Sequence, residues 1–236
     1  MASLARTIEP STPSTTEGVR RTAASGLAAF TGLTGAGWLA WAKAGVPSWG
    51  ATPDTTARWY AAHVDGARIG ALLGTLGLIG FIVFVSAMHE ILASAEREPR
   101  LWSGVATIGG ILTAVVHFAF LTFLFAAALR PGVVDSSTTA TMHDLFLLTA
   151  GTAPPIYLAM IGGVAAVAFK SGLFPRSTAW ACVAIAVAQL LPLGAPFDHG
   201  GLFDPGRGLF GLFVPFGGLF VWALLMVKHL WTPSRS

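Results

Sequence analysis

The chain has 236 residues, of which 54% are hydrophobic and 11% are charged, with a formal charge of +3 and a mean hydropathy of +0.69. Soluble domains contain about 25% charged residues, so this composition excludes an ordinary soluble enzyme and a disordered protein, and it predicts an integral membrane protein. The single Cys182 excludes an intrachain disulfide and a thiolate metal cluster. Basic and aromatic residues do not alternate, so we expect no nucleic-acid partner.

The first expected element is an arm over residues 1–21, rich in Ser, Thr and Pro, which is a composition typical of disorder. An uncharged run over 22–42 follows, and it is long enough to cross a membrane as a helix. The alternative for this run is a signal peptide cleaved near Ala42. The run is longer than the hydrophobic core of about 7–15 residues that signal peptides have, which disfavours cleavage.

Five more uncharged runs follow along the chain, at 69–88, 101–129, 145–169, 177–197 and 208–227. Each has about the 20 residues that cross a hydrocarbon core of about 30 Å. In lipid the backbone of such a run must satisfy its hydrogen bonds within a helix. We therefore expect an all-α, polytopic membrane protein, with six transmembrane helices in a domain over 22–231 and a short tail over 232–236.

The distribution of Lys and Arg predicts the orientation of these helices. With the amino terminus inside, nine Lys and Arg residues lie in inner segments and five in outer segments. Cytoplasmic segments of membrane proteins are enriched in these residues. Both termini are therefore expected in the cytoplasm, and the protein is expected in a bacterial plasma membrane with lipid around it. The sequence does not identify a protein partner, so that partner stays unknown.

Small residues indicate where helices pack closely. Gly70, Gly74 and Gly77 recur at i, i+4 and i+7 in the run over 69–88, which places them on one side of a helix. Bare backbone of this kind lets a second helix approach. We expect that second helix within this chain, and a dimer face is the alternative.

Polar groups inside apolar runs are candidates for binding a ligand, because they are costly in hydrocarbon unless they face a cavity or another polar group. His117, Tyr157 and Gln189 lie within expected helices, and Thr152 precedes Pro154-Pro155. A proline removes a backbone hydrogen bond and bends a helix. Prolines in the same half of three helices therefore indicate an outward-facing cavity. The alternative at Thr152 is a kink whose carbonyls accept hydrogen bonds from Thr hydroxyls, with no ligand.

Three further candidates, His143, Asp144 and Asp198, lie immediately beside the expected helices. Imidazole and carboxylate groups serve as general acid and base, so these residues are the catalytic candidates if the protein is an enzyme. No pair of histidines has the spacing of metal ligands on one helix, and His117 is the one histidine in its run. We therefore expect neither a metal nor another cofactor. Helix capping is the alternative for Asp144.

The chain also resembles a group of multi-helix membrane proteins common in high-GC Gram-positive bacteria. The resemblance rests on Pro154-Pro155-Ile156-Tyr157, on the connection from Lys170 to Arg176, and on Ala179-Trp180 at the start of the next run. It covers about residues 66–230. It implies a six-helix fold in the cytoplasmic membrane, and it provides no activity and no site residue.

Three functional hypotheses follow. The first is a protein that binds, or helps to move, a small and largely apolar molecule through an outward-facing cavity near His117, Thr152, Tyr157 and Gln189. The second is a membrane-embedded enzyme that acts on a lipid or prenyl substrate, similar to terpene cyclases, through the His and Asp candidates. The third is a structural or regulatory subunit of a membrane complex.

Overall fold

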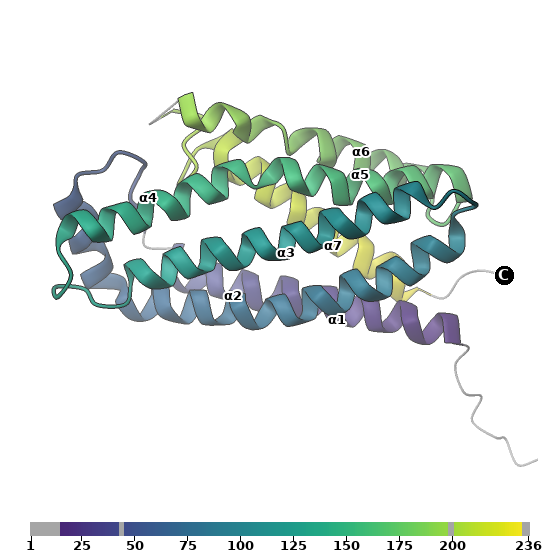
Figure 1. Ribbon diagram of the computed structural model, residues 1–236, viewed down its shortest axis with the longest axis horizontal. Coiled ribbons are helices and arrows are strands. Elements are labelled where there is room, and N and C mark those ends of the chain that lie inside the picture. Colours follow the sequence, from purple (N-terminus) through teal and green to yellow (C-terminus); the bar gives the residue numbers. More distant parts are fainter. Residues whose placement is uncertain (1–14, 43–44, 198–200, 233–236) are drawn as a thin grey trace, which may run out of the picture.

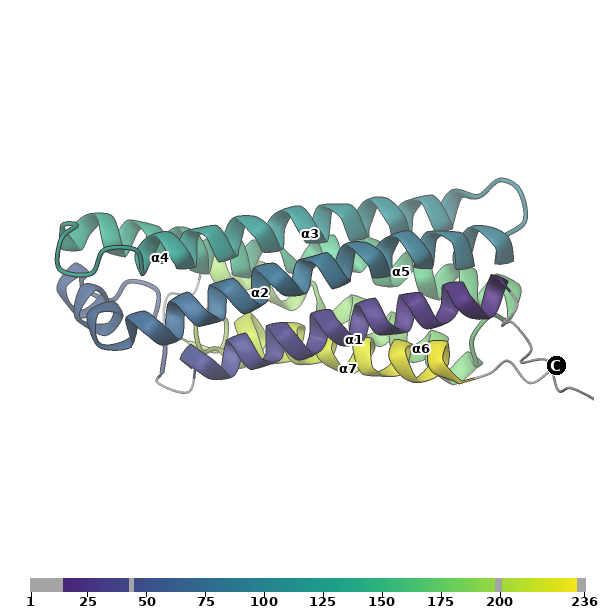
Figure 2. The same ribbon diagram turned by 90° about the horizontal axis from the view of Figure 1, so that it is seen from below.

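The computed structural model describes residues 15–42, 45–197 and 201–232. Within these ranges the chain is all-helical and contains no strand. The helices lie along one long axis and form an elongated bundle (Figures 1 and 2). They are α1 (Thr15–Trp41), α2 (Pro53–Ala95), α3 (Leu101–Ala127), α4 (Ser136–Thr152), α5 (Pro154–Ser171), α6 (Arg176–Ala188) and α7 (Val214–Trp231), with shorter helical turns η2 (Leu191–Phe197) and η3 (Leu209–Phe213).

Five segments are long and apolar enough to cross a membrane: Pro53–Ala95, Leu101–Ala127, Ser136–Ser171, Arg176–Ala195 and Leu209–Trp231. They correspond to five of the six expected runs. Helix α1 is not among them, because Gly and Thr recur along its sequence and lower its hydropathy. The all-helical prediction and the membrane class are supported, whereas the sixth crossing and the location of the termini stay predictions.

Helix α1 begins at Thr15, so the expected disordered arm is wrong for residues 15–21; residues 1–14 lie outside the described residues. Two contacts explain the longer helix. Arg21 forms an ion pair with Glu17 one turn earlier, which supports helix formation. Arg20 donates a hydrogen bond to the backbone carbonyl of His229 in α7, at 2.7 Å.

Helix α2 is much longer than the expected run, with 43 residues, or about 64 Å at 1.5 Å per residue. Thr52 caps its start by accepting a hydrogen bond from the Thr55 amide. His63 interrupts it with non-helical dihedral angles (φ −127°, ψ 22°). The segment before His63 therefore turns away from the bundle axis (Figure 1).

The expected helix over 145–169 is two helices, α4 and α5, which meet at Ala153. Pro154 and Pro155 lack the amide hydrogens that would continue α4. Hydrogen bonds from the Ala153 amide to the Thr149 carbonyl (3.0 Å) and from the Ile156 amide to the Ala153 carbonyl (2.9 Å) keep the chain nearly continuous through the break. One segment that is long and apolar enough to cross a membrane is thus built from two helices in sequence.

Prolines also shorten the last two expected helices. Helix α6 ends at Ala188, and the remainder of the expected helix is the 3-10 segment η2, which contains Pro192. The run that starts near residue 208 begins with the π-helical turn η3 before Pro215 at the start of α7. Because a proline cannot donate to the carbonyl four residues earlier, the backbone there adopts a different helical turn.

Glycines set the distances between the helices. A Cβ at Gly26 of α1 would lie 2.6 Å from the Gly80 carbonyl oxygen of α2, and a Cβ at Gly37 would lie 2.8 Å from that of Gly70. Gly74 faces Leu121 of α3, and Gly77 faces Phe30 and Thr34 of α1. The glycines predicted to pack a second helix therefore do so within this chain, and a Cβ at Gly26 or Gly37 would clash with the backbone of α2.

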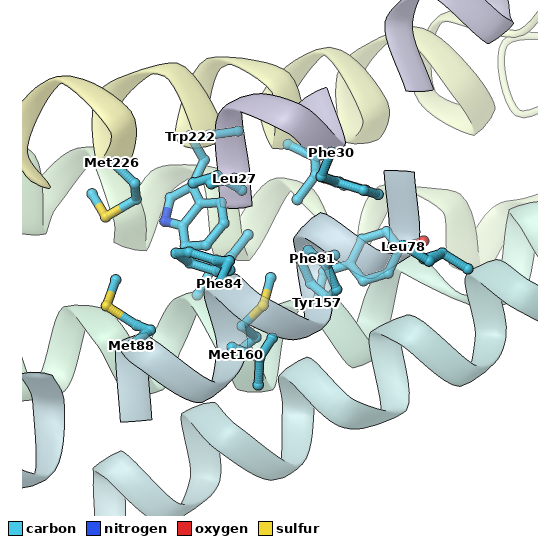
Figure 3. Close-up of a cluster of buried hydrophobic side chains, with 14 of the residues drawn as sticks. Leu27, Phe30, Leu78, Phe81, Phe84, Met88, Tyr157, Met160, Trp222 and Met226 are labelled. Carbon is cyan, nitrogen blue, oxygen red and sulfur yellow. The ribbon is translucent and has the colours of Figure 1, made fainter. Parts of the chain in front are cut away.

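The core lies where α1, α2, α5 and α7 face one another (Figure 3). Phe30 of α1 packs on Phe81 of α2, with ring centroids 4.7 Å apart, and Phe84 meets Trp222 of α7 edge to face at 5.8 Å. Edge-to-face and tilted pairs of this kind are the favoured aromatic geometries. The aromatic side chains therefore hold α1 and α7 against the centre of α2.

The start of α1 and the end of α7 lie at the same end of the bundle, together with the α2–α3 loop (Figures 1 and 2). We call this the terminal end, and the opposite end, formed by residues 45–52, 128–135 and 201–208, the distal end. Seven described Lys and Arg residues lie at the terminal end and four at the distal end: Arg20, Arg21, Arg97, Arg100, Lys170, Arg176 and Lys228 against Arg58, Arg68, Arg130 and Arg207.

Glu96 caps α3 at the terminal end. Its carboxylate accepts hydrogen bonds from the backbone amides of Trp102 (3.1 Å) and Ser103 (2.8 Å). Burial raises the pKa of this carboxyl, but the hydrogen bonds outweigh burial and leave the pKa below its ordinary value. The ionised carboxylate therefore stabilises the fold above its unfolded-state pKa, and this stabilisation is lost as the pH falls through the folded-state pKa.

We expect Glu96→Gln to lower the stability by about 1–2 kcal/mol at pH 7, as the loss of a helix cap does. The deficit relative to the wild type should shrink at acidic pH, where the wild-type carboxylate also loses its charge. Thermal unfolding in detergent, measured in steps from pH 7 down to pH 3, measures both effects. Glu98→Gln is the matched control, since Glu98 is exposed and pairs with Arg100; an equal loss of stability in both variants would contradict the capping role.

Candidate functional site

His117 and Tyr157 meet in the middle of the bundle, as two of the four predicted ligand-binding residues. Both side chains are buried. The His117 Nδ1 atom lies 3.2 Å from the Tyr157 hydroxyl and 3.2 Å from the Thr113 carbonyl oxygen. Nδ1 either donates a proton to that carbonyl or accepts one from the phenol. These bonds leave the Nε2 atom without a hydrogen bond to any residue in the described part of the chain.

A crevice runs beside His117 between α1, α2, α3 and α7. Its buried wall includes Phe30, Phe81 and Trp222, and its partly exposed lining residues, Thr31, Trp38 and Phe220, come from α1 and α7. The crevice therefore opens sideways between these two helices, and not toward the distal end. It encloses about 20 Å³, which is room for about one water-sized group.

Thr34 is a second polar group in the crevice, and the sequence did not single it out. Its side chain is 7% exposed, and its hydroxyl has no hydrogen-bond partner among the described residues. Thr hydroxyls in helices usually donate to a carbonyl one turn earlier, and Thr31 in the same helix does so to Leu27 (2.8 Å). An unpaired buried hydroxyl is costly, so Thr34 is the unusual one of the two.

The other two predicted ligand-binding residues lie elsewhere. Thr152 is exposed on α4 and donates to the Leu148 carbonyl (2.8 Å), which fits the alternative of a kink stabilised by Thr hydroxyls. Gln189 is buried at the end of α6, where its amide nitrogen donates to the carbonyls of Ile185 (3.3 Å) and Pro215 (3.1 Å). Neither residue lines the crevice beside His117.

His143 joins three parts of the chain at the distal end. Its Nε2 atom lies 3.1 Å from the Pro47 carbonyl oxygen, and its Nδ1 atom lies 3.0 Å from the Tyr60 hydroxyl of α2. A carbonyl only accepts, so Nε2 carries the proton and the Tyr60 hydroxyl donates to Nδ1. Both nitrogens of this buried ring are engaged. His143 could act as a base only after it gives up the bond from Tyr60.

Asp204 is a buried carboxylate beside this group. It is 0% exposed, and its Oδ1 atom accepts a hydrogen bond from the Gly206 amide (2.7 Å). Its Oδ2 atom has no hydrogen-bond partner among the described residues, although the exposed Arg207 forms an ion pair with it at 3.4 Å. Gly206 lies against both this carboxylate and the Pro47 carbonyl. The sequence Asp204-Pro205-Gly206 is typical of a turn, and it is the feature of the sequence that could have indicated this arrangement.

The remaining catalytic candidates are not assembled with His143. Asp144 is half-buried on the next position of α4 and forms no hydrogen bond with another described residue. Asp198 lies outside the described residues. Across residues 15–42, 45–197 and 201–232, no three His, Cys, Asp or Glu side chains gather as metal ligands do.

The structure thus places His117 beside the crevice at mid-bundle, with Tyr157 bonded to it, and His143 in a hydrogen-bonded group at the distal end. Thr152, Gln189 and Asp144 belong to neither place. Comparison with protein-family models, with curated proteins and with solved structures found no match. Several apolar helices nevertheless mark the chain as a membrane-embedded protein.

Proposed function

We propose that this chain is a multi-pass plasma-membrane protein that binds, or helps to move, a small and largely apolar molecule carrying one polar group. The observation that carries this proposal is a largely apolar crevice lined by His117 and Thr34, because the buried Thr34 hydroxyl, which lies against Gly77 of α2, has no hydrogen-bond partner among the described residues. Membrane proteins keep polar groups in hydrocarbon at a cost, and such groups commonly serve a ligand.

The size and direction of the crevice define how the molecule would bind. The enclosed volume of about 20 Å³ accommodates a hydroxyl or carbonyl group, but not the body of a ligand. The polar group would therefore bond to Thr34 and His117, while the apolar part lies between α1 and α7 at the level of the lipid chains. Entry from the lipid replaces the outward-facing route that the prolines indicated.

We further propose that α1 is a sixth crossing and that both termini face the cytoplasm. The excess of Lys and Arg at the terminal end supports this orientation. The α1–α2 glycine contacts support a membrane location for α1, since they hold it along an apolar helix.

Native mass spectrometry of the protein released from its own membrane, with identification of the molecules that stay bound, tests the binding proposal. Thr34→Val removes the hydroxyl and keeps the shape of the side chain. We expect about tenfold weaker retention, which corresponds to about 1.4 kcal/mol for one hydrogen bond. Because the hydroxyl is unpaired without ligand, the ligand-free variant should unfold at the same temperature or higher.

Thr31→Val is the matched control, since Thr31 lines the same crevice but its hydroxyl is bonded to Leu27. It should retain the molecule, whereas His117→Ala should lose it. Retention of bulk phospholipid alone by the wild type, or undiminished retention by Thr34→Val, would overturn the proposal. The enzyme hypothesis would instead be favoured if the wild type turns over a lipid substrate and Asp144→Asn abolishes this turnover while the substrate still binds.

A further inference from the structure

A second and larger cavity lies at the terminal end, far from the crevice at mid-bundle. It has a volume of about 530 Å³ and lies between the α2–α3 loop and the end of α5. The lining residues that matter here are Glu96, Arg97, Glu98, Leu101, Trp102 and Lys170. Polar and charged groups dominate this list, so the cavity differs in kind from the apolar crevice.

The carboxylates in this cavity already have partners. Glu96 accepts the amide hydrogens of Trp102 and Ser103 at the start of α3. Glu98 forms an ion pair with Arg100, at 3.3 Å. Neither carboxylate therefore needs a cation from a ligand.

The cations of this cavity, Lys170 and Arg97, form no salt bridge within the described ranges, although the positive charge of Lys170 helps to lower the pKa of Glu96 in the same cavity. Lys170 places its ammonium 5.6 Å from the centroid of the Trp102 ring. A Lys and an Arg that face one open cavity favour an anion between them. The packing of α3 on α5 holds Lys170 there, because Gly163 of α5 lies directly against Trp102 and Ala106.

The level of the cavity along the bundle points to the source of that anion. Leu101 is 59% exposed and begins the apolar run of α3, and Trp102 has the position of an aromatic residue at a membrane interface. The cavity thus lies at the boundary between the hydrocarbon core of the membrane and the lipid headgroups. Basic residues between helices at this level bind lipid phosphates, and Lys170 and Arg97 are the basic residues of this cavity, which Glu96 and Glu98 also line.

We infer that this cavity binds a phosphate group through Lys170 and Arg97, with an anionic phospholipid headgroup as the source and a soluble phosphate ester as the other possible source of the same chemistry. The Trp102 ring lines the cavity beneath the lysine. This site is separate from the crevice of the proposed function and does not depend on it.

The experiment uses the full-length protein in nanodiscs and in detergent. Native mass spectrometry compares the amount of retained phosphatidylglycerol, which is anionic, with that of phosphatidylcholine, which has no net charge. In a second measurement, the unfolding temperature is followed as phosphatidylglycerol is added. We expect preferential retention of phosphatidylglycerol and a rise in the unfolding temperature. Lys170→Gln and Arg97→Gln should each weaken retention about tenfold, and Lys170→Arg should restore it, since the charge is kept.

Arg176→Gln is the matched control, because Arg176 is exposed at the same end but does not line the cavity. Equal retention of the two lipids, or an Arg176→Gln effect as large as that of Lys170→Gln, would overturn the inference. Glycerol phosphate decides the source: displacement of bound phosphatidylglycerol by millimolar glycerol phosphate supports a soluble ester, and failure to displace it supports the lipid.

Discussion

Gly163→Ala is expected to destabilise the protein by about 2–3 kcal/mol, the cost of overpacking a tight contact. A Cβ at Gly163 would lie 2.7 Å from the Ala106 amide nitrogen and 2.8 Å from the Trp102 carbonyl oxygen. Both atoms belong to the backbone of α3, so a change of side-chain rotamer cannot relieve the clash. Helix α5 would have to move away from α3. Thermal unfolding in detergent, followed by intrinsic fluorescence, measures the loss.

The neighbouring Gly162 provides a matched control. A Cβ there meets nothing within 4 Å, so Gly162→Ala should be neutral or slightly stabilising, because alanine favours the helix. The same comparison can be made on α1, where Gly26 touches α2 and Gly32 meets nothing within 4 Å. Equal unfolding temperatures for Gly163→Ala and Gly162→Ala would show that α3 and α5 do not pack as closely as described.

His143→Ala is expected to cost about 3–4 kcal/mol, because it leaves the buried Tyr60 hydroxyl and Pro47 carbonyl without a partner and opens a cavity. The ring joins α2, α4 and the chain before α2, so the loss should loosen the whole distal end. Hydrogen exchange of the amides in residues 45–62, together with the unfolding temperature, measures this loosening.

Asp144→Asn is the control for this position, and we expect a change within about 0.5 kcal/mol, because the half-buried Asp144 side chain forms no hydrogen bond with another described residue. Tyr60→Phe removes one of the two hydrogen bonds of the ring and should cost about 1 kcal/mol. The double variant with His143→Ala should lose less than the sum of the single variants, since the two residues share one bond. Strict additivity would contradict the Tyr60–His143 hydrogen bond.

Much of the fold follows from composition and from the apolar runs. Charge-free segments of about 20 residues in lipid are expected to be helices, which is why five of the expected runs coincide with segments that are long and apolar enough to cross a membrane. The element ends are less predictable, since they depend on local contacts. The Glu17–Arg21 pair extends α1 into a polar segment, and Pro192 and Pro215 replace regular turns with 3-10 and π-helical ones.

The candidate site was only partly predictable, because a sequence gives the depth of a residue in the membrane but not the direction of its side chain. Tyr157 and Thr152 lie five positions apart across a helix break, and one faces His117 while the other faces outward. Thr34 was missed because threonine in an apolar helix ordinarily satisfies its own hydroxyl. Only the packing of α1 against α2 and α7 reveals that it does not.

The glycine contacts of α1 have a consequence for how the protein is made. α1 has the weakest hydropathy of the bundle and is followed directly by the strongly apolar α2. A segment of such marginal hydrophobicity is transferred inefficiently from the translocon into the bilayer when it is alone. Since Gly26 and Gly37 fit the backbone of α2 so closely, we expect the two helices to enter the bilayer together as a hairpin, with the second helix providing the driving force for the first.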